Sequence, residues 1–500
     1  MNIRPVLAGS LAVILLAASC QRAPESEPRT VVIGQVTSAT GLDPHLHDEE
    51  STHSALSHFY ERLVAFGPDL SIRPELAVKW TNPTDTAWRF TLREGVLFHD
   101  GTPLAAEDVV LSLRRAGRLP GSQVVHYLQN VTSVTALTAR EVEVITSSPS
   151  PLLLNKLAFV AIVPRSTADR AISRPVGTGP YRFVSGAPRE ALEGEAFDRY
   201  WGPRPAFHRV RVVPLPDARS RAHAIVEGRA DVVSRFPFEF TSWARSRKGV
   251  TLAARIGLGV AFLGFSLREG SPYADRRVRE AFALAIDRSR MIDAAESEYT
   301  VNADQFVPGA VFGYAPPSRP WRHDLARSRA LLAEAGHPTG MDVTLVLPDT
   351  QATLGARLGT LLGEAGIRVR LETLPWDDYH ARWLRRDLDL CGFAYTAGTG
   401  DASDLLDAVF HSRSASSGAL NTSGYASAAF DGLVDEAGRV LDPYRRQELM
   451  SDALAILRED LPAIPLVVRS NLYAVSDGIS WTARQDRRVR AQDMRPRAAR

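Results

Sequence analysis

The sequence predicts an α/β fold, because strands and helices alternate along most of its length. The alternation is clearest between residues 324 and 395. There, residues 343–347 and 367–371 have a two-residue apolar repeat, while apolar residues over 354–362 recur every three or four positions. Strands that are separated by helices pair in parallel, so this region predicts a largely parallel sheet with helices on both faces.

The N-terminal third begins with a strand, a turn and a helix. Residues 30–36 are rich in β-branched side chains, and Asp43 and Pro44 end this run. Apolar residues on one helical face predict a helix over residues 51–66. Alternating apolar residues then predict a half-buried strand over residues 88–98.

A mixed segment follows that strand. Leu104 to about Arg115 is predicted to be a helix, with Thr102 as its N-cap. Two alternating runs between residues 131 and 146 predict an antiparallel pair. Residues from Phe66 to about Pro164 therefore form an expected α+β domain of their own.

Shorter runs continue the pattern toward the C-terminus. Residues 210–233 predict a strand, a helix and a short strand. Asp324 is expected to cap a helix that Gly336 ends, since glycine accepts the left-handed conformation found there. Residues 463–473 form the last predicted strand. Residues 484–500 carry seven arginines and two aspartates, and they predict a solvated, disordered tail, with a binding arm as the alternative.

The first residues have the pattern of a bacterial secretory signal. Arg4 precedes an apolar run from Val6 to Ala18, and small residues stand directly before Cys20. We expect residues 1–19 to be removed, Cys20 to be lipidated and residues 20–29 to be a polar linker. The protein would then be periplasmic and anchored to a bacterial membrane by lipid, with simple secretion as the alternative.

Composition and motifs exclude several functions. The chain has 59 basic and 57 acidic residues, a balance that argues against nucleic-acid binding. With 45% hydrophobic residues it is not predominantly disordered, and two cysteines cannot build a disulfide framework. No nucleophile elbow, phosphate-binding loop, dinucleotide-binding loop or zinc-protease motif is present. We therefore expect that the protein is not an enzyme and that it binds no cofactor.

Two features leave a choice open. Four of the 12 histidines fall between residues 45 and 58 among acidic side chains, which suits either a divalent metal or ordinary packing. Cys391 lies in an apolar run and is expected to be a buried hydrophobic residue rather than a nucleophile.

The loop from Thr396 to Asp404 is the candidate ligand site. Ligands of parallel sheets bind beyond the carboxyl ends of the strands, and this glycine-bearing loop follows such a strand. Trp376 and Tyr395 end neighbouring strands, so they either line the same cleft or pack against another part of the chain. Asp401 and Asp404 are each either a partner for a ligand cation or the N-cap of the following helix, and capping is the favoured role for Asp404.

Several separated motifs resemble those of the family 5 extracellular solute-binding proteins, the peptide, dipeptide and nickel receptors of ATP-binding-cassette importers. The similarity extends from about Thr30 to Ile479. The motifs are Leu42-Asp43-Pro44-His45, Tyr60-Glu61-Arg62-Leu63, Pro74-Glu75-Leu76-Ala77, Phe90 to Leu104, Gly177-Thr178-Gly179-Pro180-Tyr181 and Asp275 to Arg288.

The resemblance implies a two-lobed type II periplasmic-binding-protein fold, similar to cluster C, that encloses a ligand between its lobes. Lobe 1 would comprise residues 30–258, with the inserted α+β domain at about 66–164. Lobe 2 would comprise residues 259–462, and residues 463–483 would return to lobe 1. A monomer would deliver its ligand to permease subunits.

The resemblance also implies the binding residues. Gly177, Thr178 and Gly179 would offer backbone contacts from lobe 1, and Trp376, Tyr395, Gly398 and Asp401 would line lobe 2. Peptide-binding members pair the ligand's amine with an aspartate, but Gly398 stands at that position here. Asp401 is the candidate substitute.

The expected function is therefore capture of a short peptide or a related small solute. A non-peptide or modified-peptide ligand stays open, as does a metal or metal-chelate receptor of the nickel type. A secreted hydrolase is a further alternative, for which no acid/base pair is identifiable.

Overall fold

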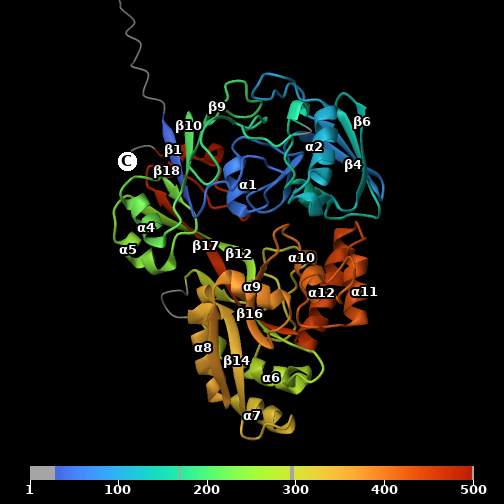
Figure 1. Cartoon of the computed structure of the whole chain (residues 1–500), viewed down its shortest axis with the longest axis vertical. Helices are drawn as coiled ribbons and strands as arrows, with labels where there is room; N and C mark the ends of the chain where they lie inside the picture. The colour runs from blue at the N-terminus through green and yellow to red at the C-terminus, as the bar shows by residue number, and fades with distance from the viewer. Residues whose placement is uncertain (1–28, 168–169, 293–297, 498–500) are drawn as a thin grey trace, which may run out of the picture.

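A mixed eleven-stranded sheet runs through both lobes of the protein (Figure 1). The computed structural model describes residues 29–167, 170–292 and 298–497. The strand order is β15-β14-β16-β12-β17-β11-β1-β10-β9-β8, with β13 beside β17. The expected signal and lipidated Cys20 lie outside the described residues. In the described ranges, no helix is long and apolar enough to span a bilayer.

Lobe 1 contains one end of this sheet. Its strands and helices are β1 (Thr30–Gln35), β8 (Tyr181–Ser185), β9 (Leu192–Ala196), β10 (Arg209–Pro214), β11 (Val232–Val233), α1 (Glu50–Leu56), α4 (Ala218–Val226) and α5 (Thr241–Arg245). β1 pairs in parallel with β10 and with β11. Buried apolar residues of these elements, such as Ile33 and Val212, form one core.

Lobe 2 contains the other end and confirms the α/β prediction. Its elements are α6 (Arg276–Ala285), β13 (Thr300–Asn302), α7 (Leu325–Glu334), β14 (Met341–Pro348), α8 (Ala352–Glu364), β15 (Ile367–Leu374), α9 (Trp376–Leu384), β16 (Leu390–Thr396), α10 (Ser403–Leu405), α11 (Ala428–Ala437) and α12 (Pro443–Asp460). β14 pairs in parallel with β15 and with β16. As predicted, Asp324 caps α7 by accepting a hydrogen bond from the Arg327 amide.

Two long strands connect the lobes. β12 (Val250–Phe265) and β17 (Ala463–Ser476) pair antiparallel along most of their length. β17 also pairs with β11 in lobe 1, and β12 with β16 in lobe 2. Their register is irregular between Ile256 and Val260. A side chain at Gly257 would clash with the Arg469 carbonyl, which explains the glycine there.

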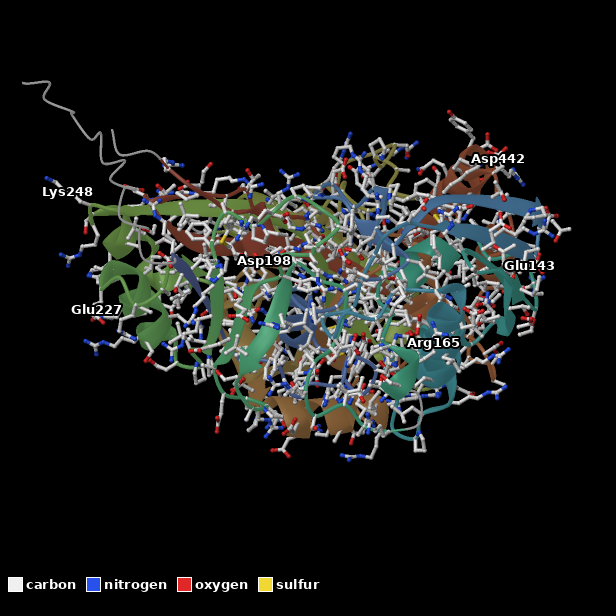
Figure 2. The ribbon with its side chains drawn as sticks, turned by 90° about the horizontal axis from the view of Figure 1, so that it is seen from above. Glu143, Arg165, Asp198, Glu227, Lys248 and Asp442 are labelled. Atoms are coloured by element: carbon white, nitrogen blue, oxygen red, sulfur yellow. The ribbon has the colours of Figure 1, made fainter. Side chains whose placement is uncertain are left out.

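The inserted domain has its own sheet and core. Its elements are β2 (Val64–Phe66), β3 (Ile72–Pro74), β4 (Ala77–Thr84), β5 (Ala87–Leu92), α2 (Ala106–Arg118), β6 (Val131–Thr138), β7 (Glu141–Thr146) and α3 (Leu153–Leu157). The sheet order is β4-β5-β7-β6, and β6 pairs antiparallel with β7 as predicted. Figure 2 shows Glu143 of this domain at the opposite end of the molecule from Lys248 and Glu227. In Figure 1 the domain faces α11 and α12 of lobe 2.

Two predicted helices have different bounds. The first, expected over residues 51–66, ends at Leu56, and β2 then pairs with β3. The apolar pattern here could not distinguish a helix from a turn followed by a strand. The structure buries Phe59, Tyr60 and Leu63, and one face of a helix would have buried them as well. The second helix begins at Ala106 rather than Leu104.

The start of that second helix has a different cap from the predicted one. Ala105 is the N-cap, and its amide donates to the Asp108 carboxylate at 2.9 Å. Thr102 instead donates its amide to Asp100 in the preceding turn. The Asp108 carboxylate therefore supplies the hydrogen bond at this helix start, and the predicted threonine cap is wrong.

Residues 484–497 of the arginine-rich C-terminal segment pack against lobe 1, so the prediction of a disordered tail is wrong for this part of the chain. Val489, Ala491 and Met494 are fully buried and belong to the core of lobe 1. β18 (Ile479–Ser480) pairs with β19 (Arg495–Pro496), and this end of the chain lies beside β1 in Figure 1. The Arg484 charge is satisfied internally, since Arg484 pairs with two nearby aspartates and donates to the Phe66 carbonyl.

A buried glutamate of lobe 1 lies beside the inserted domain, whose Ile162 amide donates to its carbonyl. Glu61 accepts hydrogen bonds from the Tyr200 hydroxyl at 2.9 Å and from the Trp201 indole at 2.8 Å. Burial, with a further contribution from the charge of Glu75, raises the pKa of Glu61 to about 8. The folded protein therefore favours a protonated Glu61 near neutral pH.

Replacement of Glu61 by Gln is expected to flatten the pH dependence of stability. In the wild type, the folded state binds more protons than the unfolded state between pH 4.5 and about 8, so this group's contribution falls as pH rises through that range. Urea unfolding at pH 5 and pH 8 measures the difference. Glu94→Gln, at an exposed position, is the control and should leave the wild-type dependence unchanged. An unchanged dependence in Glu61→Gln would contradict the assignment.

Candidate ligand-binding site

A cavity of about 620 Å³ separates the inserted domain from lobe 2. The inserted domain contributes residues 126–130 and 148–156 to its lining, excluding a few positions in each range. Lobe 2 contributes the loop after β16, the start of the following helix and the end of α11. The volume lies within the range of about 300–1,000 Å³ that small-molecule sites usually have.

A second cavity of about 520 Å³ adjoins the first. It lies between the turn at Asp69 and the side chains of Phe312 and Arg446, and Pro151 lines both cavities. Between them, the Asn155 amide group donates to the Thr399 carbonyl at 2.8 Å and so joins the two walls. Both cavities therefore lie between the inserted domain and lobe 2, and the hydrogen bond from Asn155 to Thr399 crosses the space between the two walls.

Tyr395 and Gly398, both named from the sequence, line the larger cavity. The Tyr395 hydroxyl donates to the Asp404 carbonyl at 2.9 Å, which fixes the ring at the start of the helix. Gly398 is exposed to the cavity, and a Cβ built there meets no atom within 4 Å. A larger side chain would therefore also fit at this position, and the absence of one leaves the space open for a ligand.

Asp401 does not have the expected free carboxylate. It is buried, and its two oxygens accept hydrogen bonds from Arg446 at 3.0 and 3.1 Å. One oxygen also accepts from the Ser403 amide. Arg446 is itself buried and lies over the Phe312 ring. This ion pair occupies Asp401, so a role as substitute partner for a ligand amine does not fit the geometry.

Trp376 lies away from the cavity, although it was expected to line it. The side chain is 56% exposed at the start of α9 and stacks on His380, with ring centroids 5.3 Å apart. It is absent from the lining of either cavity described above. Trp376 begins α9, two residues after β15 ends at Leu374, and its ring lies on the exposed face of that helix.

The Gly177-Thr178-Gly179 segment packs inside lobe 1. The Gly177 amide donates to His99, and the Gly179 amide donates to the Phe59 carbonyl at 3.0 Å. A Cβ on either glycine would clash with the backbone of residues 58 and 59. Thr178 is fully buried. Close packing explains these residues, and the glycine amides expected to contact a ligand are already bonded.

Sequence reasoning missed four charged residues that line the cavity: Lys156, Asp407, Asp435 and Arg439. Asp404 was expected to be an N-cap, but Ala402 holds that position, and Asp404 accepts from the Thr399 amide and hydroxyl instead. Burial raises the pKa of Asp404 to about 6, and burial also raises that of Asp407. The three-residue spacing of the two aspartates was the available signal, because it places both on one helical face.

Two of the four histidines between residues 45 and 58, His45 and His58, are fully buried and hydrogen-bonded inside the protein. Arg115 donates to Nδ1 of His45, whose Nε2 donates to the Ala161 carbonyl. His58 donates from Nδ1 to Ala55 and accepts the Ala491 amide at Nε2. Burial lowers the pKa of both rings to about 4. Among the residues that the structure describes, no group of three or more His, Cys, Asp or Glu is arranged for a metal ion.

Two lobes that are joined by two crossing strands and separated by a large cleft have the organisation of a binding protein. Known proteins have the same organisation. HbpA2 from Haemophilus parasuis has a TM-score of 0.83 at 22% identity, with 94% of this chain and 100% of that chain covered. DppA from Helicobacter pylori, in complex with peptide STSA, has a TM-score of 0.78 at 23% identity, with coverages of 93% and 98%. These similarities support the two-lobed α/β fold.

Sequence comparison gives the family. The glutathione-binding protein GsiB from Salmonella typhi is 26% identical over 490 residues, which cover 94% of this chain and 95% of that protein. The sequence profile of the bacterial extracellular solute-binding proteins, family 5, matches residues 71–417. The chain therefore belongs to this family of solute-binding proteins.

Proposed function

We propose that this chain is the extracytoplasmic substrate-binding component of an ATP-binding-cassette importer. It captures a short peptide or a related small solute in the 620 Å³ cavity and delivers it to permease subunits. The observation that carries this proposal is the cavity itself, because its walls come from the two parts of the molecule that closure brings together. The glutathione-binding relatives and the peptide complex of DppA favour a peptide-like ligand.

The proposal includes the domain division and the anchor. Residues 30–258 form lobe 1 with the inserted domain at about 66–164, residues 259–462 form lobe 2, and residues 463–483 return to lobe 1. Cleavage before Cys20 and its lipidation attach a monomeric receptor to the membrane. Intact-mass measurement of the protein from its own membranes tests the anchor, since mature protein beginning at Cys20 should carry the mass of the acyl chains.

Native mass spectrometry of the protein from its own periplasm, followed by denaturing release, tests the function. A released peptide or small solute supports the receptor. A released metal chelate would instead favour the nickel-type alternative, and turnover of a peptide panel would favour a hydrolase. If the protein carries nothing and binds no member of a peptide panel, the proposed function is wrong.

Replacement of Gly398 by Trp is expected to weaken ligand binding at least tenfold while leaving the fold intact. The new side chain fills the cavity, and no neighbouring atom obstructs its Cβ. Titration of the released ligand, or of a peptide that binds the wild type, measures the loss. Gly432→Trp on α11 is the matched control, because its Cβ also meets no atom within 4 Å and it does not line the cavity. Equal binding by both variants would place the ligand elsewhere.

A further inference from the structure

The two lobes carry net charges of opposite sign. Lobe 1 without the inserted domain, residues 29–65, 165–258 and 463–497, has 26 arginines and lysines but only 17 aspartates and glutamates. Lobe 2, residues 259–462, has 21 basic and 29 acidic side chains, whereas the inserted domain, residues 66–164, has nine of each. The net charge of +2 for the whole chain is therefore the sum of a basic lobe and an acidic lobe. Such an asymmetry favours contact of one lobe with a surface of opposite charge.

Part of the positive charge of lobe 1 surrounds the start of β1. This strand begins beside Arg209, whose backbone amide donates to the Arg29 carbonyl at 3.3 Å. Arg495 reaches the same region from the C-terminal segment, since its charge opposes the rise in the pKa of Tyr181 that burial causes. The Tyr181 hydroxyl donates to the carbonyl of Phe207, which stands two positions before Arg209. The arginine patch comprises four exposed residues: Arg29, Arg209, Arg495 and Arg497.

The acidic side chains near this patch already have other partners. Glu193 and Glu195, on β9, pair with arginines of the neighbouring strands, and Asp493 pairs with Arg484 at 3.2 Å. Asp477 accepts a hydrogen bond from a threonine hydroxyl. In contrast, no arginine of the patch forms an ion pair with any residue that the structure describes. The positive charge of the patch is therefore available to a partner outside the chain.

The chain before β1 leads to the expected lipid anchor. Cys20 stands nine positions before Arg29, and an extended chain spans at most about 3.6 Å per residue, so the acyl chains would lie within about 30 Å of the patch. In Figure 1, β1 lies in the lobe farthest from α7 of lobe 2. The anchor would therefore hold the basic lobe, and not the acidic lobe, next to the bilayer.

We propose that the arginine patch binds anionic headgroups of the membrane that anchors the protein, so that lobe 1 lies on the bilayer and lobe 2 points away. This inference rests on the anchor in the proposed function and adds a second membrane contact to it. Anionic lipids attract basic side chains within about one Debye length, about 8 Å at physiological ionic strength. The tether keeps the patch at a high local concentration near the headgroups, so a weak attraction is sufficient. The same headgroups repel the acidic lobe 2, which favours the same orientation.

Vesicle binding without the anchor tests the patch. The mature chain, residues 20–500, is produced with the substitution Cys20→Ser so that it carries no acyl group. It is sedimented with vesicles of equal parts phosphatidylglycerol and phosphatidylcholine, or of phosphatidylcholine alone. We expect binding to the anionic vesicles at low salt, release as the sodium chloride concentration rises, and no binding to the neutral vesicles.

Removal of the patch charges should weaken binding to the anionic vesicles at least tenfold. The patch variant combines four substitutions: Arg29→Gln, Arg209→Gln, Arg495→Gln and Arg497→Gln. The matched control removes the same number of charges from exposed arginines of lobe 2 that form no ion pair with the described residues: Arg319→Gln, Arg322→Gln, Arg370→Gln and Arg413→Gln. This control should bind the vesicles at least as well as the wild type. Both variants should keep the wild-type urea unfolding transition and the wild-type affinity for the cavity ligand.

Energy transfer to a dye in the bilayer tests the orientation of the acylated protein. Ala206→Cys places a protein dye beside the patch, and Ala333→Cys places one on α7 of lobe 2. Cys391 is buried, so the dye reacts with the introduced thiol. We expect strong transfer from position 206 and weak transfer from position 333.

Several results would overturn the proposal. These are equal binding to neutral vesicles, binding that salt does not weaken, an equal loss in the two arginine variants, or equal transfer from the two labels. Absence of vesicle binding would also overturn it and would leave the basic lobe to an acidic protein surface. None of these results affects the receptor, which ligand release tests separately. A mature protein without acyl chains that still binds anionic vesicles through the patch would show that the anchor is wrong and the patch is right.

Discussion

Ending the chain at Ala483 is expected to abolish the cooperative unfolding of lobe 1. The deleted segment buries Val489 and Met494 completely, and each such side chain stabilises a fold by about 1.5–3 kcal/mol. The deletion also leaves His58 without the Ala491 amide and the Ala158 carbonyl without Arg488. Buried groups that lose their partners cost about 1–3 kcal/mol each. The sum is comparable with the whole stability of a domain, about 5–15 kcal/mol.

Circular dichroism during heating measures this loss, and a milder variant keeps the test informative if the truncated chain does not accumulate. Met494→Ala creates a cavity in the same core and should cost about 2–5 kcal/mol in urea unfolding. Arg497→Ala, at an exposed position near the same end, should lie within about 0.5 kcal/mol of the wild type. Wild-type stability in both the truncated chain and Met494→Ala would show that the segment contributes nothing to the core.

Replacement of Asp401 by Ala is expected to destabilise the protein by about 3–5 kcal/mol, the usual cost of removing one partner of a buried ion pair. Arg446 would remain buried beside Phe312 with only the Ala437 carbonyl and the Ser403 hydroxyl to accept its hydrogen bonds. Denaturant unfolding at pH 7 measures the change. The carboxylate accounts for the loss, since the arginine cannot give up its proton.

Two controls separate stability from ligand binding at this site. Asp198→Ala breaks the ion pair with Arg204, whose side chains are more than 70% exposed, and should cost no more than about 1 kcal/mol. At a temperature where Asp401→Ala remains folded, its affinity for ligand should lie within a few fold of the wild type. Full stability together with lost binding would instead mean that the carboxylate faces the ligand.

The sequence predicted lobe 2 well because its elements end at local signals. Asp324 caps a helix, Gly336 and Gly366 adopt positive φ values of 92° and 90°, and the apolar repeats between them belong to single strands and helices. Neighbouring residues determine each of these features. The alternation of strand and helix there was sufficient to predict parallel pairing.

The C-terminal segment could not be predicted because its partners are distant in sequence. Arg488 donates to the Ala158 carbonyl, and Arg484 donates to Phe66. A run of arginines without these partners has the composition of a solvated tail. Tertiary contacts with residues more than 300 positions away therefore reversed the expectation from composition.

Only part of the candidate site could be predicted, because contacts between distant parts of the chain also build this site. The loop after β16 was identified from the rule for parallel sheets, and Tyr395 and Gly398 do line the cavity. Lys156 comes from an inserted domain whose placement no local pattern specifies. The ion pair of Asp401 could not be predicted because its partner, Arg446, lies on α12, 45 positions further along the chain.

The pair of crossing strands has a mechanical consequence. A hydrogen-bonded ladder resists sliding of one strand along the other, whereas a two-stranded ribbon bends easily where its register is irregular. In this protein the register shifts between Ile256 and Val260 and again between Ala261 and Phe262. Relative motion of the lobes should therefore be a rotation about one axis at these residues. The side-chain amide of Gln485 donates to the Ile256 carbonyl, and its backbone amide donates to the Pro68 carbonyl. The C-terminal segment therefore contacts the hinge and should limit the angle to which the lobes open.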